Sequence, residues 1–234
     1  MNSQNLGKII GYLLLLGFAG YAIFSHLYNQ ESLNRLCRED GLIEWLTAIF
    51  YFAAAVLLIV GNKKYGFKNP WFWFFAALFF VVAGEEISWG QRIFGIVTPE
   101  NLESVNVQQE FNLHNVDGIH QNVRSVGVLF VLTICYLIPL ANWLIKGVNQ
   151  IVEKLKLPVY PLWLVAVPTI ALLFMIIPRL LFDLVDFNLD EIGEAYLALG
   201  FLLFGISTLQ SRETTNQLAA EMHEPISITP PYES

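Results

Sequence analysis

Long apolar runs alternate with short polar connections along the chain, and this pattern predicts a helical membrane protein. The runs approach the ~20 residues that an α-helix needs to cross the hydrocarbon layer. They lack the alternation of lipid-facing and lumen-facing residues that a β-barrel needs, so the predicted fold class is all-α, a polytopic transmembrane helical bundle. We expect about six spans, near residues 9–28, 42–60, 70–90, 126–145, 158–182 and 192–209.

The spans leave no room for a separate soluble domain, so residues 1–210 are predicted to form a single transmembrane helical domain. The first apolar run continues to about Tyr28, which is too long for a cleaved signal peptide and indicates an uncleaved span. Pro168 and Pro178 each remove a backbone donor, and we expect a kink in the fifth span. The polar, proline-containing tail 211–234 is predicted to be disordered.

The longest connection, 91–125, is predicted to be structured, because it mixes apolar and polar residues. Thr98, Pro99 and Glu100 resemble a helix start, with threonine as the cap and proline in the first turn. Loops of this length in compact proteins are often functional.

Composition supports a membrane location, since 55% of the residues are hydrophobic and only 14% are charged, against about a quarter charged in soluble domains. The net charge of −7 argues against nucleic acid and against anionic lipid as partners. Cys37 falls in a loop and Cys135 in a span, so we expect no internal disulfide and infer no redox compartment.

Basic and acidic residues favour opposite faces of the predicted membrane domain. The face that bears the N-terminus has eight lysines and arginines and the second face has five, so the positive-inside rule places both termini in the cytoplasm of a plasma (bacterial inner) membrane. Fifteen of the twenty acidic residues belong to the second, non-cytoplasmic face, which also carries loop 91–125.

The segment AGEEISWGQR provides the candidate catalytic residues Glu85, Glu86, Ser88 and Arg92. Glu85 lies 15 residues after the start of its span, about 22 Å along a helix, where an ionised carboxylate is expensive and often functional. In a continuous helix, Glu85, Ser88 and Arg92 would share one face. In the alternative interpretation, Arg92 and Arg124 neutralise Glu85 and Glu86 in a buried, purely structural ion-pair network.

Four residues from separate segments are the candidate metal ligands: Glu44, Glu85, His114 and Glu194. They are expected at one membrane level, in a carboxylate-rich pocket that opens away from the cytoplasm. So many like charges cannot all ionise close together, and a divalent cation would remove the repulsion. Oxygen ligands with one or two histidines suit Zn, Mn, Fe or Ca, and the sequence does not choose among them.

Two further details bear on this pocket. Glu110 and His114 are four residues apart and would share a face if their segment were helical, and His120 is a second histidine candidate. Asp190 is interpreted as a cap of the last span, where a carboxylate also meets the positive end of the helix.

The segments AGEEISWGQRIFGIVTPENL, NVQQEFNLHN and DEIGEAYLALGFLL resemble a group of uncharacterised bacterial multi-pass membrane proteins, over about residues 40–205. This resemblance implies no activity. Glu85 and Ser88 are also similar to the E-x-x-S element of the alkaline ceramidase and adiponectin-receptor-like membrane hydrolases, in which histidines hold zinc. This chain lacks their late H-x-x-x-H pair and has six predicted spans where they have seven, so the likeness concerns chemistry and not membership.

Three functions fit these features. The first is a metal-dependent hydrolase or transferase that acts on a lipid or lipid-linked substrate, with Glu85 or Glu86 as base and Arg92 holding an anionic head group. The second is a non-catalytic accessory or assembly subunit whose acidic face docks a membrane protein partner. The third is an ion-coupled transporter, which the position of the acids near one surface and the lack of an inverted repeat disfavour.

Overall fold

A computed structural model of the chain describes residues 3–38, 41–106, 109–113, 116, 118–182 and 186–223. Within these ranges the regular elements are helices, apart from one antiparallel bridge between Asn106 and Val116, so the all-α prediction is confirmed. The helices are α1 (Ser3–Tyr28), α2 (Gln30–Cys37), α3 (Leu42–Asn62), η1 (Lys63–Tyr65), α4 (Pro70–Glu86), η2 (Ser88–Gly90), α5 (Gln91–Phe94), α6 (Glu100–Glu103), α7 (His120–Val131), η3 (Leu132–Leu137), α8 (Ile138–Leu144), α9 (Lys146–Leu155), η4 (Leu162–Leu164), α10 (Ala166–Phe182) and α11 (Phe187–His223).

Four helical stretches in the described residues are long and apolar enough to cross a membrane: Leu42–Tyr65, Asn122–Leu144, Leu162–Leu181 and Phe187–Leu209. A fifth crossing is counted if α4 and the helix after it, which are bent by 69° relative to each other, form one broken span. The apolar part of α1, Leu15–Tyr28, is shorter than these stretches. The structure therefore supports a membrane protein with four to five candidate spans.

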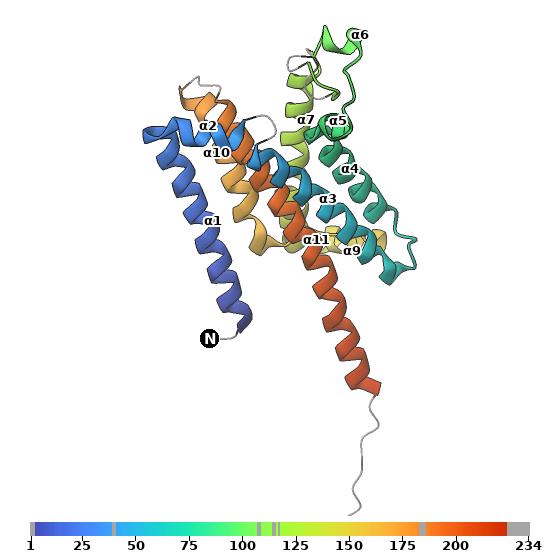
Figure 1. Cartoon of the computed structure of the whole chain (residues 1–234). Coiled ribbons are helices and arrows are strands. Elements are labelled where there is room, and N and C mark those ends of the chain that lie inside the picture. The colour runs from blue at the N-terminus through green and yellow to red at the C-terminus, as the bar shows by residue number, and fades with distance from the viewer. Residues whose placement is uncertain are drawn as a thin grey trace, which may run out of the picture.

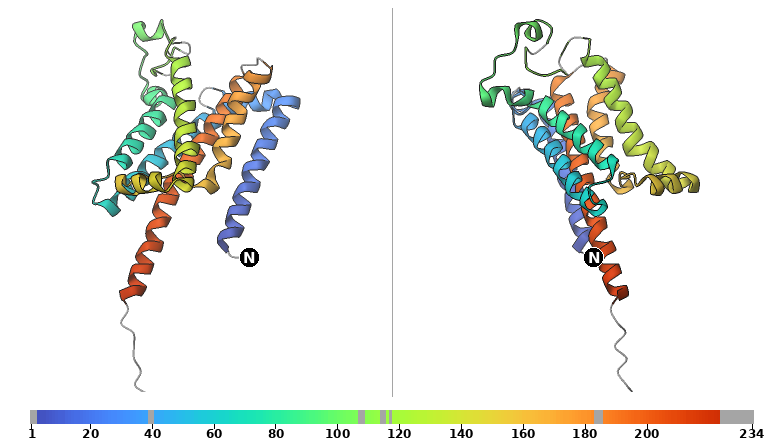
Figure 2. Two further views of the ribbon diagram at one scale, coloured as in Figure 1. Left: turned by 180° about the vertical axis from the view of Figure 1, so that it is seen from behind. Right: turned by 90° about the vertical axis from the view of Figure 1, so that its right-hand side faces the viewer.

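The long helices run side by side between two ends of one bundle, as Figures 1 and 2 show. α1, α4 and α10 lead towards the end that carries α2, α5 and α6, and α3, α7–α8 and α11 lead back from it. α9 lies crosswise at the opposite end (Figure 2). α11 packs against both α3 and α10, and α3 packs against α4.

Aromatic rings fill the contact between α4, α11 and their neighbours. Phe79 of α4 and Phe201 of α11 are both buried, and their ring centroids lie 4.6 Å apart. Phe75 meets Phe204 edge to face at 6.2 Å, one helical turn further along both helices. Tyr51 of α3 stacks on Phe201 at 6.2 Å. Because these rings come from three helices, they fix how α3, α4 and α11 bring their polar ends together.

α4 begins where the sequence predicts a span to begin, at Pro70. Pro70 occupies the first turn, as predicted, and the side chain of Asn69 caps the helix by accepting a hydrogen bond from Trp71 N at 3.0 Å. Asn62 is fully buried and exchanges two hydrogen bonds of 3.1 Å with the backbone of Asn69. This pair of asparagines closes the turn between α3 and α4.

Two expectations for the second half of the chain differ from the structure. Pro168 lies in the first turn of α10, which begins at Ala166 after η4, so it removes no hydrogen bond from the helix interior, whereas Pro178 lies inside α10. α11 continues as a helix through 211–223, where the sequence predicted a disordered tail. That stretch contains neither glycine nor proline and is rich in strong helix formers. Residues 224–234 lie outside the described residues.

Candidate functional site

Three helices bring acidic side chains to the same end of the bundle, as the sequence predicts for Glu44, Glu85, Glu86 and Glu194. α3 and α11 begin at that end and α4 terminates there (Figure 1). Glu194, Glu191, Glu44 and Glu85 all act electrostatically on Glu86, and each would repel its charge. We call these five residues the carboxyl cluster. Its members are half-buried.

The chain breaks sharply directly after Glu86, and the predicted continuous helix face is therefore wrong. α4 ends at Glu86, and the following helical turns leave its axis by 69°. Ser88 and Trp89 adopt left-handed backbone angles, with φ of 46° and 54°, which are uncommon for residues other than glycine. Gly90 follows with φ of 74°, where glycine carries no steric cost. The break turns Ser88 and Arg92 away from α4 and towards the loop.

Glu85, in the last turn of α4, has two hydrogen-bond partners in the chain beyond this break. One carboxylate oxygen accepts a hydrogen bond of 2.7 Å from the indole Nε1 of Trp89. The other accepts a hydrogen bond of 2.7 Å from the backbone N–H of Leu113. Glu85 thus ties the distant end of the loop to the end of α4, beside the carboxyl cluster.

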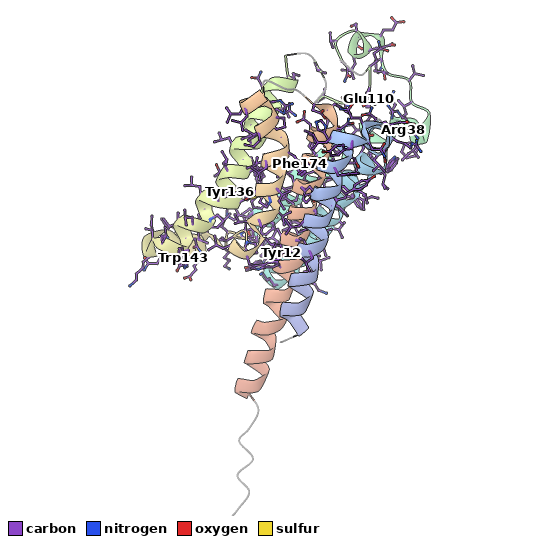
Figure 3. The ribbon with its side chains drawn as sticks, turned by 90° about the vertical axis from the view of Figure 1, so that its left-hand side faces the viewer. Tyr12, Arg38, Glu110, Tyr136, Trp143 and Phe174 are labelled. Atoms are coloured by element: carbon purple, nitrogen blue, oxygen red, sulfur yellow. The ribbon has the colours of Figure 1, made fainter. Side chains whose placement is uncertain are left out.

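A second, buried group of polar side chains holds the same loop through Glu110. Arg92 forms an ion pair with Glu110. The hydroxyl of Ser88 donates to Glu110 Oε2 at 2.7 Å, and Asn112 Nδ2 donates to the same oxygen at 2.8 Å. Asn106 Nδ2 in turn donates to Asn112 Oδ1 at 2.8 Å. We call these five residues the Glu110 network; Figure 3 labels Glu110 at this end of the bundle.

Gln91 and Thr98 add a third attachment between the break and the loop. Gln91 Nε2 donates to Thr98 Oγ1 at 2.6 Å, and Gln91 Oε1 accepts from Phe111 N at 2.6 Å. The hydroxyl of Thr98 donates to the carbonyl of Gln109 at 2.8 Å. Thr98 is therefore not the cap of α6; Pro99 occupies that position, and no side chain caps the helix there.

Asp190 is not a helix cap, as the sequence suggested, but the acceptor for two arginines. Arg179 of α10 binds both of its carboxylate oxygens, and Arg124 Nη2 of α7 lies 2.9 Å from Oδ2. The capping position belongs to Asp186, whose Oδ1 accepts a hydrogen bond from Leu189 N at 3.0 Å. Arg124 and Arg92 do form ion pairs, but the partners are Asp190 and Glu110, whereas the sequence predicted Glu85 and Glu86.

A metal site is not visible in the part of the chain that the structure describes. No group of three or more His, Cys, Asp or Glu side chains there is arranged to hold a metal ion. His114 and the side chain of His120 lie outside the described residues, so the structure leaves their predicted role as ligands open. Residues 109–113 are not helical, which removes the i, i+4 argument for pairing Glu110 with His114.

Sequence reasoning missed Glu191, Asn106 and Asn112 at this site. It named Glu110, but as a partner of His114 and not of Arg92 and Ser88. Glu191 is next to Asp190 in sequence and joins the carboxyl cluster because α11 already begins at Phe187, so that Glu191 is in its second turn. The several asparagines in the loop could have indicated the Glu110 network, because buried amide side chains need hydrogen-bond partners.

Compared with protein-family models, curated proteins and solved structures, the chain matches none of them. The resemblance to bacterial multi-pass membrane proteins and the analogy to the ceramidase-like hydrolases therefore stay predictions.

Proposed function

We propose that the chain crosses the membrane six times, with α1 as the first span and both termini in the cytoplasm. α1 has 26 residues, about 39 Å of helix. It packs along the other helices: Tyr196 of α11 donates a hydrogen bond to Leu15 O, and the hydroxyl of Tyr12 bonds to Trp163 O. The excess of lysine at the end where α9 lies supports a cytoplasmic position for that end.

We propose further that the protein is a membrane enzyme whose carboxyl cluster, completed by His114, binds a divalent cation and acts on a lipid or lipid-linked substrate. The carboxyl cluster carries this proposal. Five acidic side chains in apolar helix ends repel one another and are expensive to ionise, unless protons or a cation neutralise them. A bound cation would supply an electrophile and activate water for hydrolysis or transfer.

His114 is the proposed nitrogen ligand because of the residue that precedes it. The backbone N–H of Leu113 is bonded to Glu85, a member of the carboxyl cluster. His114, the predicted histidine ligand, directly follows Leu113 in the sequence, and we propose it as the ligand that completes the site. Since the described carboxyl groups alone form no metal site, the proposal depends on this histidine.

The contacts divide the predicted catalytic residues into two roles. Ser88 and Arg92 are engaged with Glu110, and in the proposal they position the loop and touch no substrate. Glu85 holds Leu113 and the indole of Trp89. Glu86 lies among the other four carboxyl groups, and it is the proposed general base.

Metal analysis of the detergent-purified protein tests this proposal. We expect about one divalent cation per chain, and its loss in Glu44→Gln, Glu194→Gln and His114→Ala, whereas Glu86→Gln removes the proposed base and should keep the cation. Glu100→Gln, an exposed acidic residue of α6, is the matched control and should keep the metal. A wild-type protein without metal after dialysis against Zn, Mn, Fe and Ca in turn would refute the proposal, as would ligand variants that bind metal normally.

Activity is tested separately with membrane lipid extracts and detection of products by mass spectrometry. The metal-loaded wild type should release lipid products, and Glu86→Gln should reduce the rate by at least about 100-fold, the usual contribution of a general base. Metal binding without any lipid turnover would favour a non-enzymatic role.

The Glu110 network favours a second candidate, a non-catalytic accessory subunit. Every member of that network is engaged with another, as in a structural unit that presents a fixed loop surface to a partner. In this case the purified protein would lack metal, and loop substitutions would disrupt a membrane complex and not a reaction.

A further inference from the structure

The end of the bundle opposite the carboxyl cluster is strongly basic. The turn between α3 and α4 and the segment from α9 to Lys156 contain one acidic residue, Glu153, and six lysines, all of them exposed: Lys63, Lys64, Lys68, Lys146, Lys154 and Lys156. We call these six residues the lysine patch. The whole-chain charge of −7 conceals this patch, because the acids are concentrated at the other end.

The two parts of the lysine patch are joined by specific contacts. Asn69 Nδ2 donates a hydrogen bond of 2.7 Å to the carbonyl of Lys156, where α9 ends. Lys64 and Lys156 both approach the ring of Tyr65, with Nζ atoms 5.0 and 5.5 Å from its centroid. Lysines that are about 90 residues apart in the sequence therefore share one surface.

α9 is an amphipathic helix that lies across the bundle and not along it (Figure 2). Val148, Ile151, Val152 and Leu155 recur at i, i+3, i+4 and i+7 and form one apolar face. Val152 is buried against the bundle, whereas Ile151 is 58% exposed and Leu155 is 48% exposed. The opposite face carries polar residues, among them Lys146. Basic, amphipathic helices of this kind lie in the plane of a membrane interface.

Exposed apolar side chains extend this surface beyond α9. Trp143, Leu144 and Ile145 directly precede α9 and are 69%, 62% and 53% exposed. Figure 3 shows Trp143 at the end of the bundle opposite Glu110. Tryptophan is favoured at the depth of lipid head groups. Apolar and aromatic groups next to lysines match the layered chemistry of a lipid leaflet, with acyl chains beneath phosphates.

We propose that α9 and the lysine patch bind the anionic phospholipid head groups of the leaflet that faces the chain termini. We infer an anionic lipid and not a neutral one from charge complementarity, because the two segments that form this surface contain six lysines and only one acidic residue. The proposal is independent of the enzymatic function, since it concerns the other end of the bundle. It replaces the expectation, drawn from net charge, that anionic lipid is not a partner.

Native mass spectrometry of the detergent-purified, full-length protein tests this binding. The protein is titrated with phosphatidylglycerol and with phosphatidylcholine of the same chain length, and the affinity of the first bound lipid is compared. Each lysine near anionic lipid contributes about a fivefold preference at low ionic strength. We expect the wild type to prefer phosphatidylglycerol by at least about tenfold, and the preference to fall as salt is raised.

Two triple variants and a control identify the surface that is responsible. Replacing Lys146, Lys154 and Lys156 with glutamine should reduce the preference by at least about fivefold, with the remainder due to the three lysines of the turn, and replacing them with arginine should retain it. Arg35→Gln, in α2 at the opposite end, is the control and should bind as the wild type does. The proposal is overturned if the wild type shows no preference, if the glutamine variant keeps it, or if the control loses it equally.

Discussion

The substitution Glu110→Gln tests whether the Glu110 network, and not chain connectivity alone, holds the loop against the end of α4. Glutamine has nearly the same shape as glutamate but removes the negative charge and one of the two acceptor oxygens. The Arg92 guanidinium then loses its ion pair with Oε1, whereas Ser88 and Asn112, which both donate to Oε2, can keep weaker bonds to the amide oxygen of glutamine.

The expected loss of loop stability in Glu110→Gln follows from how deeply Glu110 and its partners are buried. Glu110 is almost fully buried, so the hydrogen bonds that its charge strengthens are each worth about 1.5–3 kcal/mol. The side chain of Arg92 is 38% exposed, and solvent screening reduces its contribution to about 1 kcal/mol or less. Because glutamine retains part of the bonding, we expect the loop to be destabilised by about 2–3 kcal/mol.

Hydrogen–deuterium exchange measures this local stability directly. The amides of Glu110, Phe111 and Leu113 donate to Asn106, Gln91 and Glu85, and they report on the attached loop. A loss of 2–3 kcal/mol accelerates their exchange by about 30- to 150-fold. Amides in the middle of α3 and α11 should be unaffected, because those helices do not depend on the network.

A control variant and a double-mutant cycle show whether the Glu110 network itself holds the loop. Glu100→Gln removes an exposed charge from the same loop and should change exchange by less than about 0.5 kcal/mol. Combining Glu110→Gln with Arg92→Gln should show a coupling of about 1 kcal/mol. If Glu110→Gln exchanges no faster than Glu100→Gln, the network does not hold the loop and our account of it is wrong.

Three further predictions concern the rest of the bundle. Burial, together with nearby carboxylates, raises the pKa of the Cys37 thiol to about 12, so the thiol stays protonated below that pH; alkylation of folded protein should be very slow at pH 8 and should accelerate on unfolding. Asp190→Asn leaves two arginines without their carboxylate and should cost about 3 kcal/mol, more than Arg124→Gln, as measured by thermal unfolding in detergent. Gly193→Ala would drive its Cβ into the side chain of Met175 in α10 and should destabilise by about 1–3 kcal/mol, whereas Gly17→Ala meets no atom within 4 Å and should be nearly neutral in the same assay.

Each of the four candidate spans overlaps a span predicted from the sequence, because a membrane-crossing helix needs a minimum length and an apolar composition that are visible in the sequence. The starts of α3 and α4 coincide with the predicted span starts, and Pro70 marks the first turn of α4 as expected. The ends of the helices are less predictable, because a helix can continue beyond the apolar run into polar residues that also favour helix. α11 illustrates this, since it extends to His223 across polar residues.

The partners within the candidate site are harder to infer from the sequence. Spacing along an assumed helix placed Ser88 with Glu85, but the left-handed turn at Ser88 and Trp89 redirects the chain. Whether residues such as these adopt positive φ depends on the contacts that compensate the strain, here Glu110 and Asn112, and those come from the distant part of the loop. Apart from Glu191, the members of the carboxyl cluster are predicted by the sequence, because the positions of the helix ends fix their depth.

Opposite charges at the two ends of one bundle have different consequences for its orientation. Acidic residues contribute little to the choice of topology, whereas lysines in short cytoplasmic loops determine it. In the proposed topology, the lysine patch at η1 and α9 therefore retains its end of the bundle in the cytoplasm, and the carboxyl cluster reaches the other side because α3, α4 and α11 span the distance between them. In this topology the carboxyl cluster needs no orientation signal of its own, because the lysines near α9 already determine the orientation of the bundle.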